Sequence, residues 1–293
     1  MQSRNANPAM NDRAIIRACL RDTPGGGWTR HAERTTAVPG RGATACPPGF
    51  TLVELLVVVS IVALLISLLV PSLRHARESA KSVQCTSNLR QMVIAAQAYA
   101  NHYSDRYPIA YYMETSPLFV SHTWDFTTSK DWSTSPATTR VVPGLLWEGI
   151  TIERVQQCPS FAGGHMWLAD PYTGYNYNTS YIGHGSGEAI PVPAKTSWVR
   201  SPAGTALFGD GQYRSGANKF MRAPWANPGD AQFSGRSAGT QGYRHLERTN
   251  VAFCDGHARS WAERHTDTYS FDKINIAPGT GFLSSDNSLY DLE

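Results

Sequence analysis

The strongest pattern along the chain is a long, almost entirely apolar run at residues 50–70. It reads FTLVELLVVVSIVALLISLLV and ends immediately before Pro71. A helix rises about 1.5 Å per residue, so this run is roughly 31 Å long, the thickness of the hydrocarbon core of a bilayer. Core helices of soluble domains are rarely apolar on every face for so long. The run therefore predicts a transmembrane helix over residues 50–71.

Beyond Pro71 the pattern changes to a one-sided helical stripe. Apolar residues recur at steps of three and four, and charged residues fall off this stripe. The period predicts that the helix continues, kinked at Pro71, as an amphipathic segment over residues 72–103. Such a stripe packs against the chain's own head domain or against a partner helix, and we expect the head. It is formed by Cys85, Leu89, Met92, Val93, Ala96, Tyr99 and Tyr103.

Residues 104–293 are numerous enough to form a head with its own core. A β-like run at 250–254 is followed by Asp-Gly, a pair that tolerates the positive φ angles of a tight turn, so we expect a hairpin at 250–261. The Ser- and Thr-rich stretch 123–139 lacks a clear period and is interpreted as an exposed loop. A long N-terminal helix packed on a head with an antiparallel sheet is an α+β fold.

Charge divides the chain at residue 49. The first 49 residues carry seven arginines and three acidic residues, whereas the other 244 carry 19 basic and 20 acidic residues. A nucleic-acid binder concentrates its basic charge on its folded part, so nucleic acid is not an expected partner. The segment 1–49 is also rich in Pro and Gly and lacks an amphipathic period, which predicts a basic leader that is removed.

Glu54 is the one charged residue in the apolar run. An isolated carboxylate in hydrocarbon costs on the order of a few kcal/mol, so it needs a partner at the same depth. A new N-terminus at Phe50 would supply a positive amine there. We expect the amine of one subunit to neutralise Glu54 of its neighbour while their apolar helices pack side by side.

The segment 49–54, with the sequence GFTLVE, resembles the prepilin cleavage and methylation signature of type IV pilins and type II secretion pseudopilins. In that family a membrane aspartyl peptidase cuts after the glycine and methylates the new N-terminal phenylalanine. The resemblance implies processing by prepilin peptidase between Gly49 and Phe50. It also implies that the acid at Glu54 and the helix-kinking proline at Pro71 serve assembly with other pilin-like subunits.

A second resemblance lies near the C-terminus. His245 is followed by nine residues and then by Asp255 and Gly256. This spacing resembles the H-x9-D-G signature of a large group of prepilin-like proteins that share the same N-terminal start. The role of that group is poorly defined, so the resemblance bears on fold and location, and the signature residues are interpreted as structural.

Three cysteines remain after the leader, which contains Cys19 and Cys46. Cys85, Cys158 and Cys254 allow at most one internal disulfide, for which Cys85–Cys158 is our candidate, and three small buried thiols are the alternative. The chain has no C-x-x-C pair, which argues against a zinc ribbon or a thioredoxin-type site.

Imidazole and carboxylate groups in the head raise the question of a metal. Candidate ligands are His245, Asp255, His257 and Asp210. Asp255 and His257 flank the predicted tight turn, however, and Asp is favoured in such turns for backbone reasons alone. We therefore leave the metal unassigned and expect no cofactor.

The sequence as a whole predicts a structural subunit of a type IV pilus-like or type II secretion pseudopilus-like assembly, and not an enzyme. One alternative is a membrane-anchored periplasmic glycan-binding protein that does not polymerise, and another is a metal-dependent hydrolase on the same anchor. The leader arginines favour a cytoplasmic N-terminus. We expect a single-pass protein of the bacterial inner membrane whose head is periplasmic.

Overall fold

The computed structural model describes residues 50–116, 118–147, 155, 157–166, 174–185, 192–214, 216–226, 239–274 and 276–293. Gly49 and the rest of the predicted leader lie outside these residues. The chain divides into two compact units, residues 1–55 and residues 56–293.

The long helix α1 runs from Leu52 to His102. Its second half is rich in Ala and Gln and also contains Arg, Lys, Met and Leu, all of which are strong helix formers. Pro71 lies inside the helix and does not end it. The helix ends where Ser104 and Asp105 adopt left-handed φ angles of 54° and 66°, and the backbone N–H of Asp105 donates to the carbonyl of Ala100 at 2.9 Å. This bond across five residues is the closing bond of a Schellman-type helix end.

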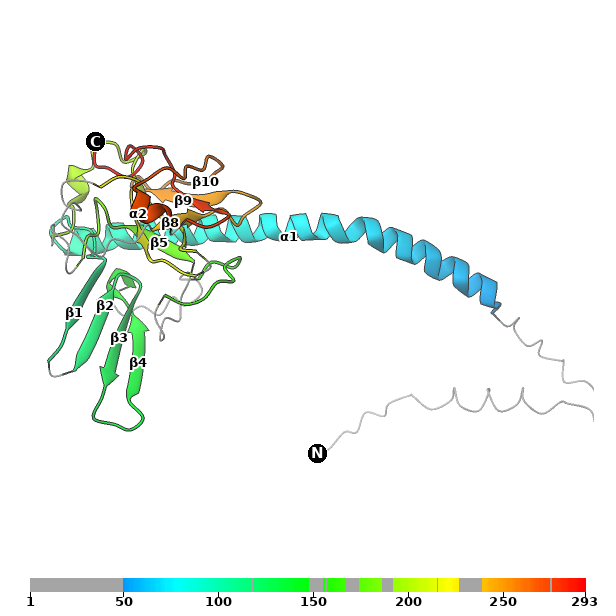
Figure 1. The fold of residues 1–293 in the computed structure, drawn as a ribbon, viewed down its shortest axis with the longest axis horizontal. Coiled ribbons are helices and arrows are strands. Elements are labelled where there is room, and N and C mark those ends of the chain that lie inside the picture. Colours follow the sequence, from blue (N-terminus) through cyan, green and yellow to red (C-terminus); the bar gives the residue numbers. More distant parts are fainter. Residues whose placement is uncertain are drawn as a thin grey trace, which may run out of the picture. The chain divides into compact units, whose positions relative to one another are not determined.

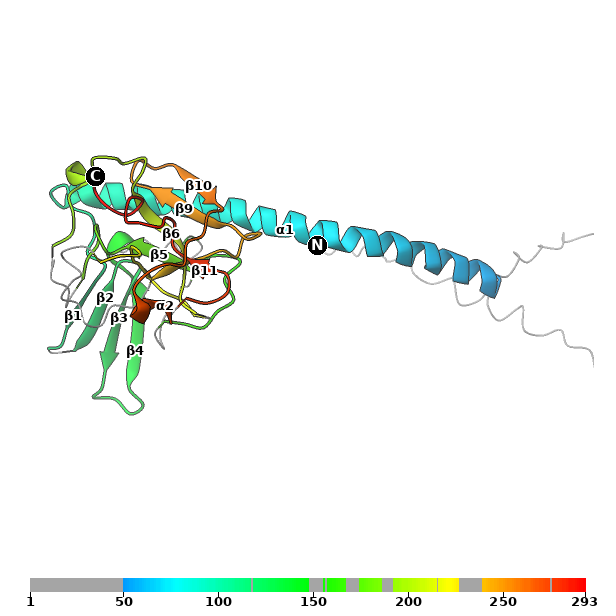
Figure 2. The same ribbon diagram turned by 45° about the horizontal axis from the view of Figure 1, so that its top comes forward.

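The C-terminal half of α1 packs on the head through the stripe that its sequence predicts. Leu89 and Met92 are fully buried, whereas Ile94 on the opposite face is 63% exposed. In Figures 1 and 2 the strands β5 (Tyr175–Asn178) and β9 (Thr249–Phe253) lie along this part of the helix. The buried helix residues are Cys85, Asn88, Leu89, Met92, Val93, Ala96 and Ala100.

The larger sheet of the head has the strand order β10-β9-β6-β5-β7, with β8 added to β6 and β11 added to β8. Its pairs are antiparallel apart from the parallel pair β5–β7. The strands β9 and β10 form the hairpin expected there, with Asp255 and Gly256 in its turn. The remaining strands are β6 (Ala206–Gln212), β7 (Phe220–Met221), β8 (Thr240–Gly242), β10 (Ala258–Trp261) and β11 (Thr280–Gly281).

A smaller sheet corrects one prediction. Residues 123–139, interpreted from the sequence as a loop, contribute to an antiparallel meander in the order β1-β2-β3-β4. Thr favours extended backbone, but both faces of these strands are mostly polar and half-exposed, so no apolar alternation marks them. The strands are β1 (Tyr111–Glu114), β2 (Phe119–Thr123), β3 (Phe126–Asp131) and β4 (Thr138–Pro143).

Aromatic side chains fill the centre of the head between α1 and the larger sheet. Tyr177 stacks on Phe208 with ring centroids 5.0 Å apart, and Trp124 meets the same ring at 5.4 Å. These contacts fix β5 and β6 beneath the helix, which positions the side chains that α1 presents to the sheet. Short helical turns complete the described chain: η1 (Leu145–Trp147), η2 (Thr196–Trp198) and α2 (Ser270–Lys273).

Candidate functional site

The start of α1 is closed by a reciprocal pair of hydrogen bonds. The backbone N–H and the hydroxyl of Thr51 both donate to Oε2 of Glu54, at 2.8 and 2.7 Å. The backbone N–H of Glu54 donates to the Thr51 hydroxyl at 3.2 Å. This arrangement is a capping box, which satisfies N–H groups that the first helical turn leaves without partners. The T-x-x-E signal of this cap is present in the sequence, and it gives Glu54 a partner within its own chain besides the predicted intersubunit one.

The apolar half of α1 is exposed on all sides. Its large apolar side chains range from 77% exposed at Leu52 to 40% at Val70, and Phe50 before the helix is 73% exposed. Among the described residues, α1 is the one helix long and apolar enough to cross a membrane. Exposed apolar surface of this extent needs a cover, either lipid or other helices.

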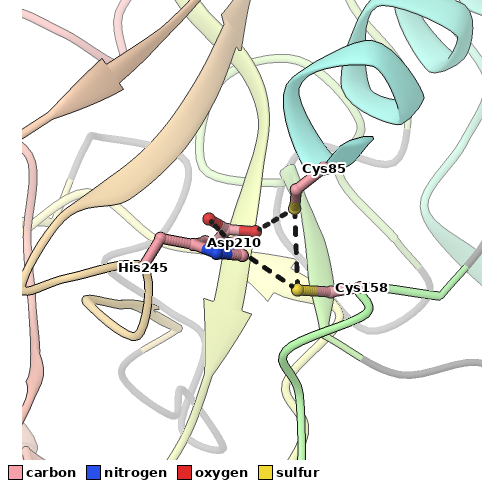
Figure 3. Close-up of side chains that lie close together, drawn as sticks. All are labelled: Cys85, Cys158, Asp210 and His245. Carbon is pink, nitrogen blue, oxygen red and sulfur yellow. Dashed lines mark hydrogen bonds and ion pairs between the residues drawn. The ribbon is translucent and has the colours of Figure 1, made fainter. Parts of the chain in front are cut away.

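A second candidate site is a buried cluster that joins α1 to the head. Figure 3 shows Cys85 from α1, Cys158 from a loop, Asp210 from β6 and His245 from the segment before β9 pointing toward one another. The two sulfurs lie 3.6 Å apart, and Nε2 of His245 lies 3.5 Å from Cys158 Sγ and 3.4 Å from Asp210 Oδ2. The Cys85 thiol donates to Asp210 Oδ1 at 2.9 Å. None of the four residues is more than 2% exposed.

Arg244 is the cation beside this cluster. Its Nε donates to Cys158 Sγ and one of its terminal nitrogens donates to Asp210 Oδ1, both at 3.2 Å. The same guanidinium also donates to the carbonyls of Gly211 and Gly174. These four acceptors hold the guanidinium in one position. Its positive charge therefore compensates negative charge on the cluster.

The two thiols of the cluster have opposite pKa shifts. Burial opposes the Cys158 thiolate, but hydrogen bonding from Cys85, the charge of Arg244 and the bond with His245 lower the pKa of Cys158 to about 5. Burial and the hydrogen bond to Cys158 raise the pKa of Cys85 well above its usual value. These opposite shifts favour one shared proton between the two sulfurs, with the negative charge on the side of Cys158 and Arg244.

The acid and the base of the cluster favour their charged forms. Although burial opposes ionisation, the charge of Arg244 and the bond with His245 hold the pKa of Asp210 below its usual value. Burial also opposes the imidazolium, but hydrogen bonds to Asp210 and Cys158 raise the pKa of His245 to about 9. The cluster without a metal is thus a network of compensating charges.

A tight turn holds the backbone of His245. Its N–H donates to the carbonyl of Arg248 at 3.0 Å, and the N–H of Arg248 donates back at 3.1 Å. Between them, Leu246 and Glu247 have φ angles of 53° and 61°, a conformation that non-glycine residues rarely adopt. Within the described residues, His245 Nδ1 is buried without a hydrogen-bond partner. The imidazole is therefore positioned mainly by this turn and by the contacts of Nε2 with Cys158 and Asp210.

The structure separates the metal ligands that the sequence analysis grouped. His245 and Asp210 come together, but Asp255 and His257 form a separate pair, with Asp255 Oδ1 2.6 Å from His257 Nδ1. The same Asp255 oxygen accepts the backbone N–H of His257 at 3.0 Å, and Gly256 between them has a φ of 95°. Asp255 and Gly256 thus serve the hairpin turn. Sequence proximity was the misleading signal, since the four residues of the cluster are spread from position 85 to position 245 and the nearest two are 35 residues apart.

Cys254 lies apart from the cluster. It is buried in the main core, where burial raises the pKa of its thiol to about 12. This cysteine packs in the core as a small apolar residue, and the Cys85–Cys158 disulfide stays a prediction.

Two family models match the chain. Residues 48–70 match the prokaryotic N-terminal methylation motif. Residues 74–135 match a family described as a protein of unknown function (DUF1559). No curated protein matches the chain, and no solved structure matches it.

These matches and the fold define the class of protein. An N-terminal methylation motif, a long helix with an exposed apolar half and an α+β head with antiparallel sheets are the features of a type IV pilin-like protein. The chain carries the prepilin-type signature, and proteins with this signature are structural. Its apolar N-terminal helix fits a single-pass membrane anchor.

Proposed function

We propose that this protein is a structural subunit of a type IV pilus-like or type II secretion pseudopilus-like assembly. Prepilin peptidase cuts between Gly49 and Phe50 and methylates the new N-terminus. The methylation motif at residues 48–70 carries this proposal, because its glycine, phenylalanine and acid keep the spacing that the peptidase reads.

The exposed apolar half of α1 supports assembly. Before processing this surface lies in the bilayer, with the N-terminus cytoplasmic and the head periplasmic. In the assembly the same surface packs against the corresponding helices of other pilin-like subunits. A helix that is apolar on every side suits both environments, because neither lipid nor a bundle of apolar helices requires a polar face.

A structural role also fits the head. Its cluster of reactive groups is fully buried, so no substrate reaches Cys85 or Asp210 without unfolding. We therefore propose that the chain is not an enzyme.

Intact-mass measurement and N-terminal sequencing of protein purified from membranes test the processing. We expect a chain that starts at methylated Phe50. Replacement of Gly49 by a bulkier residue should leave the whole leader attached, and Gly40→Ala, a glycine change elsewhere in the leader, should not affect cleavage. A native chain that retains its leader would contradict the proposal.

A further inference from the structure

We propose that Cys85, Cys158, Asp210 and His245 form a structural zinc site that fastens α1 to the head. The site is independent of the proposed assembly, since it requires only that the head folds. It brings two sulfurs, one imidazole nitrogen and one carboxylate into one buried space, with the ligand atoms within 4.8 Å of one another (Figure 3).

Three contacts among the four side chains have the lengths that a tetrahedral zinc site requires between its ligand atoms. Ligands at about 2.0–2.3 Å from zinc lie about 3.3–3.8 Å from one another around a tetrahedron. The Cys85–Cys158, Cys158–His245 and His245–Asp210 distances of 3.6, 3.5 and 3.4 Å fall in this interval. The Cys85 thiol contacts the other carboxylate oxygen of Asp210, Oδ1, and this distance of 2.9 Å is shorter because the thiol donates its proton there. Zinc binding releases this thiol proton and the Nε2 proton of His245 to solvent, and Cys85 Sγ and one carboxylate oxygen of Asp210 then separate to share the metal.

The donor types select zinc among the common divalent cations. Ca²⁺ and Mg²⁺ take oxygen ligands, whereas two thiolates, one imidazole and one carboxylate suit zinc. Four protein ligands also fill a tetrahedron, which is the arrangement of structural sites. A catalytic site keeps one position for water or substrate.

Charge balance supports the same assignment. Two thiolates, one carboxylate and a neutral imidazole around Zn²⁺ carry a net charge of −1. The guanidinium of Arg244, which contacts Cys158 Sγ and Asp210 Oδ1, brings the sum to zero. A buried group of charges needs this compensation, and N–H donors to the thiolates are the usual second shell of such a site.

The consequence for the molecule is a cross-link between α1 and three parts of the head. Because the ligands come from segments far apart in sequence, the unfolded chain has no preformed site, and the free energy of zinc binding adds to the free energy of folding. The link lies on the first buried turn of α1 after its exposed half.

The test uses the full chain purified in detergent under reducing conditions, with Cys19→Ser and Cys46→Ser to remove the leader thiols from the count. We expect about one zinc per chain by elemental analysis. Removal by a chelator should lower the melting temperature, and added Zn²⁺ should raise it again by roughly 10 °C or more.

Cys85→Ser and His245→Gln should each weaken zinc binding more than about 100-fold. Cys254→Ser is the matched control, because it removes a buried thiol outside the cluster and should retain full zinc.

X-ray absorption at the zinc edge keeps the test decisive if a ligand variant fails to fold. On the parent protein we expect two sulfur and two nitrogen or oxygen neighbours. A chain without zinc and without a Zn²⁺-dependent melting shift would overturn the proposal. So would a Cys85–Cys158 disulfide found by mass spectrometry in the protein isolated from membranes, because it removes both thiolate ligands.

Discussion

The carboxylate of Glu54 has two roles that compete for it. Within one chain it caps the start of α1 through Thr51. In an assembly it would neutralise the positive N-terminus of a neighbouring subunit. A capping carboxylate is stabilised by dipoles alone, whereas a carboxylate at membrane depth gains more from a full positive charge. Capping requires only a hydrogen-bond acceptor, which a neutral amide also supplies. Pairing with the N-terminus of a neighbour requires the negative charge.

Substitutions at this position separate the two roles. Glu54→Gln should keep the cap but reduce assembly more than tenfold, and Glu54→Ala should reduce it equally, because both lose the charge. Thr51→Ala should weaken the cap by about 0.5–2 kcal/mol and still assemble. Sheared filaments or cross-linked oligomers measure assembly, and intact mass verifies that each variant is processed. Normal assembly of Glu54→Gln would assign the acid to capping alone.

The helix α1 illustrates what sequence patterns predict well at the scale of an element. Its predicted end at residue 103 differs from the observed end, His102, by one residue. The stripe of Leu89, Met92 and Val93 is buried as its period indicates. Tyr103 is the exception, because the helix has already turned into its Schellman end and the ring is 49% exposed.

The stripe predicts a contrast between the two faces of this part of α1. Leu89→Ala should lower the free energy of unfolding by about 2–5 kcal/mol, because it removes a fully buried side chain from a packed core. Ile94→Ala, on the exposed face, should change it by no more than about 0.5 kcal/mol. Denaturant titration followed by tryptophan fluorescence measures both. Equal effects would mean that another surface covers Ile94.

Patterns failed where the structure depends on contacts distant in sequence. In the meander of β1–β4, Thr127 and Thr128 lie on opposite faces of β3 and both faces are largely polar, so apolar alternation could not mark it. For the candidate site, the sequence singled out His245 and Asp210 as ligands and Cys85 with Cys158 as a pair. It gave no reason to merge the two sets, because only the folded sheet brings β6 beneath α1.

At the scale of the whole molecule, the exposed and packed halves of α1 have separate tasks. Every residue from 56 to 77 is exposed, and the first fully buried helix residue is Cys85. The exposed half therefore contributes no packing to the head. The match to the DUF1559 family also begins at residue 74, where this exposed stretch is about to end.

A fragment of residues 74–293 should fold as a soluble head. Since it keeps all buried helix residues, we expect melting within a few degrees of the full chain in detergent and a monomeric elution volume. A fragment that starts at residue 98 lacks Cys85, Leu89, Met92 and Val93 and should not fold. Loss of one large buried side chain costs about 2–5 kcal/mol, and the total stability of a domain is about 5–15 kcal/mol. Circular dichroism and size-exclusion chromatography compare the two. Unfolding of the 74–293 fragment would mean that the apolar half of α1 stabilises the head, and anchor and head would then be one cooperative unit.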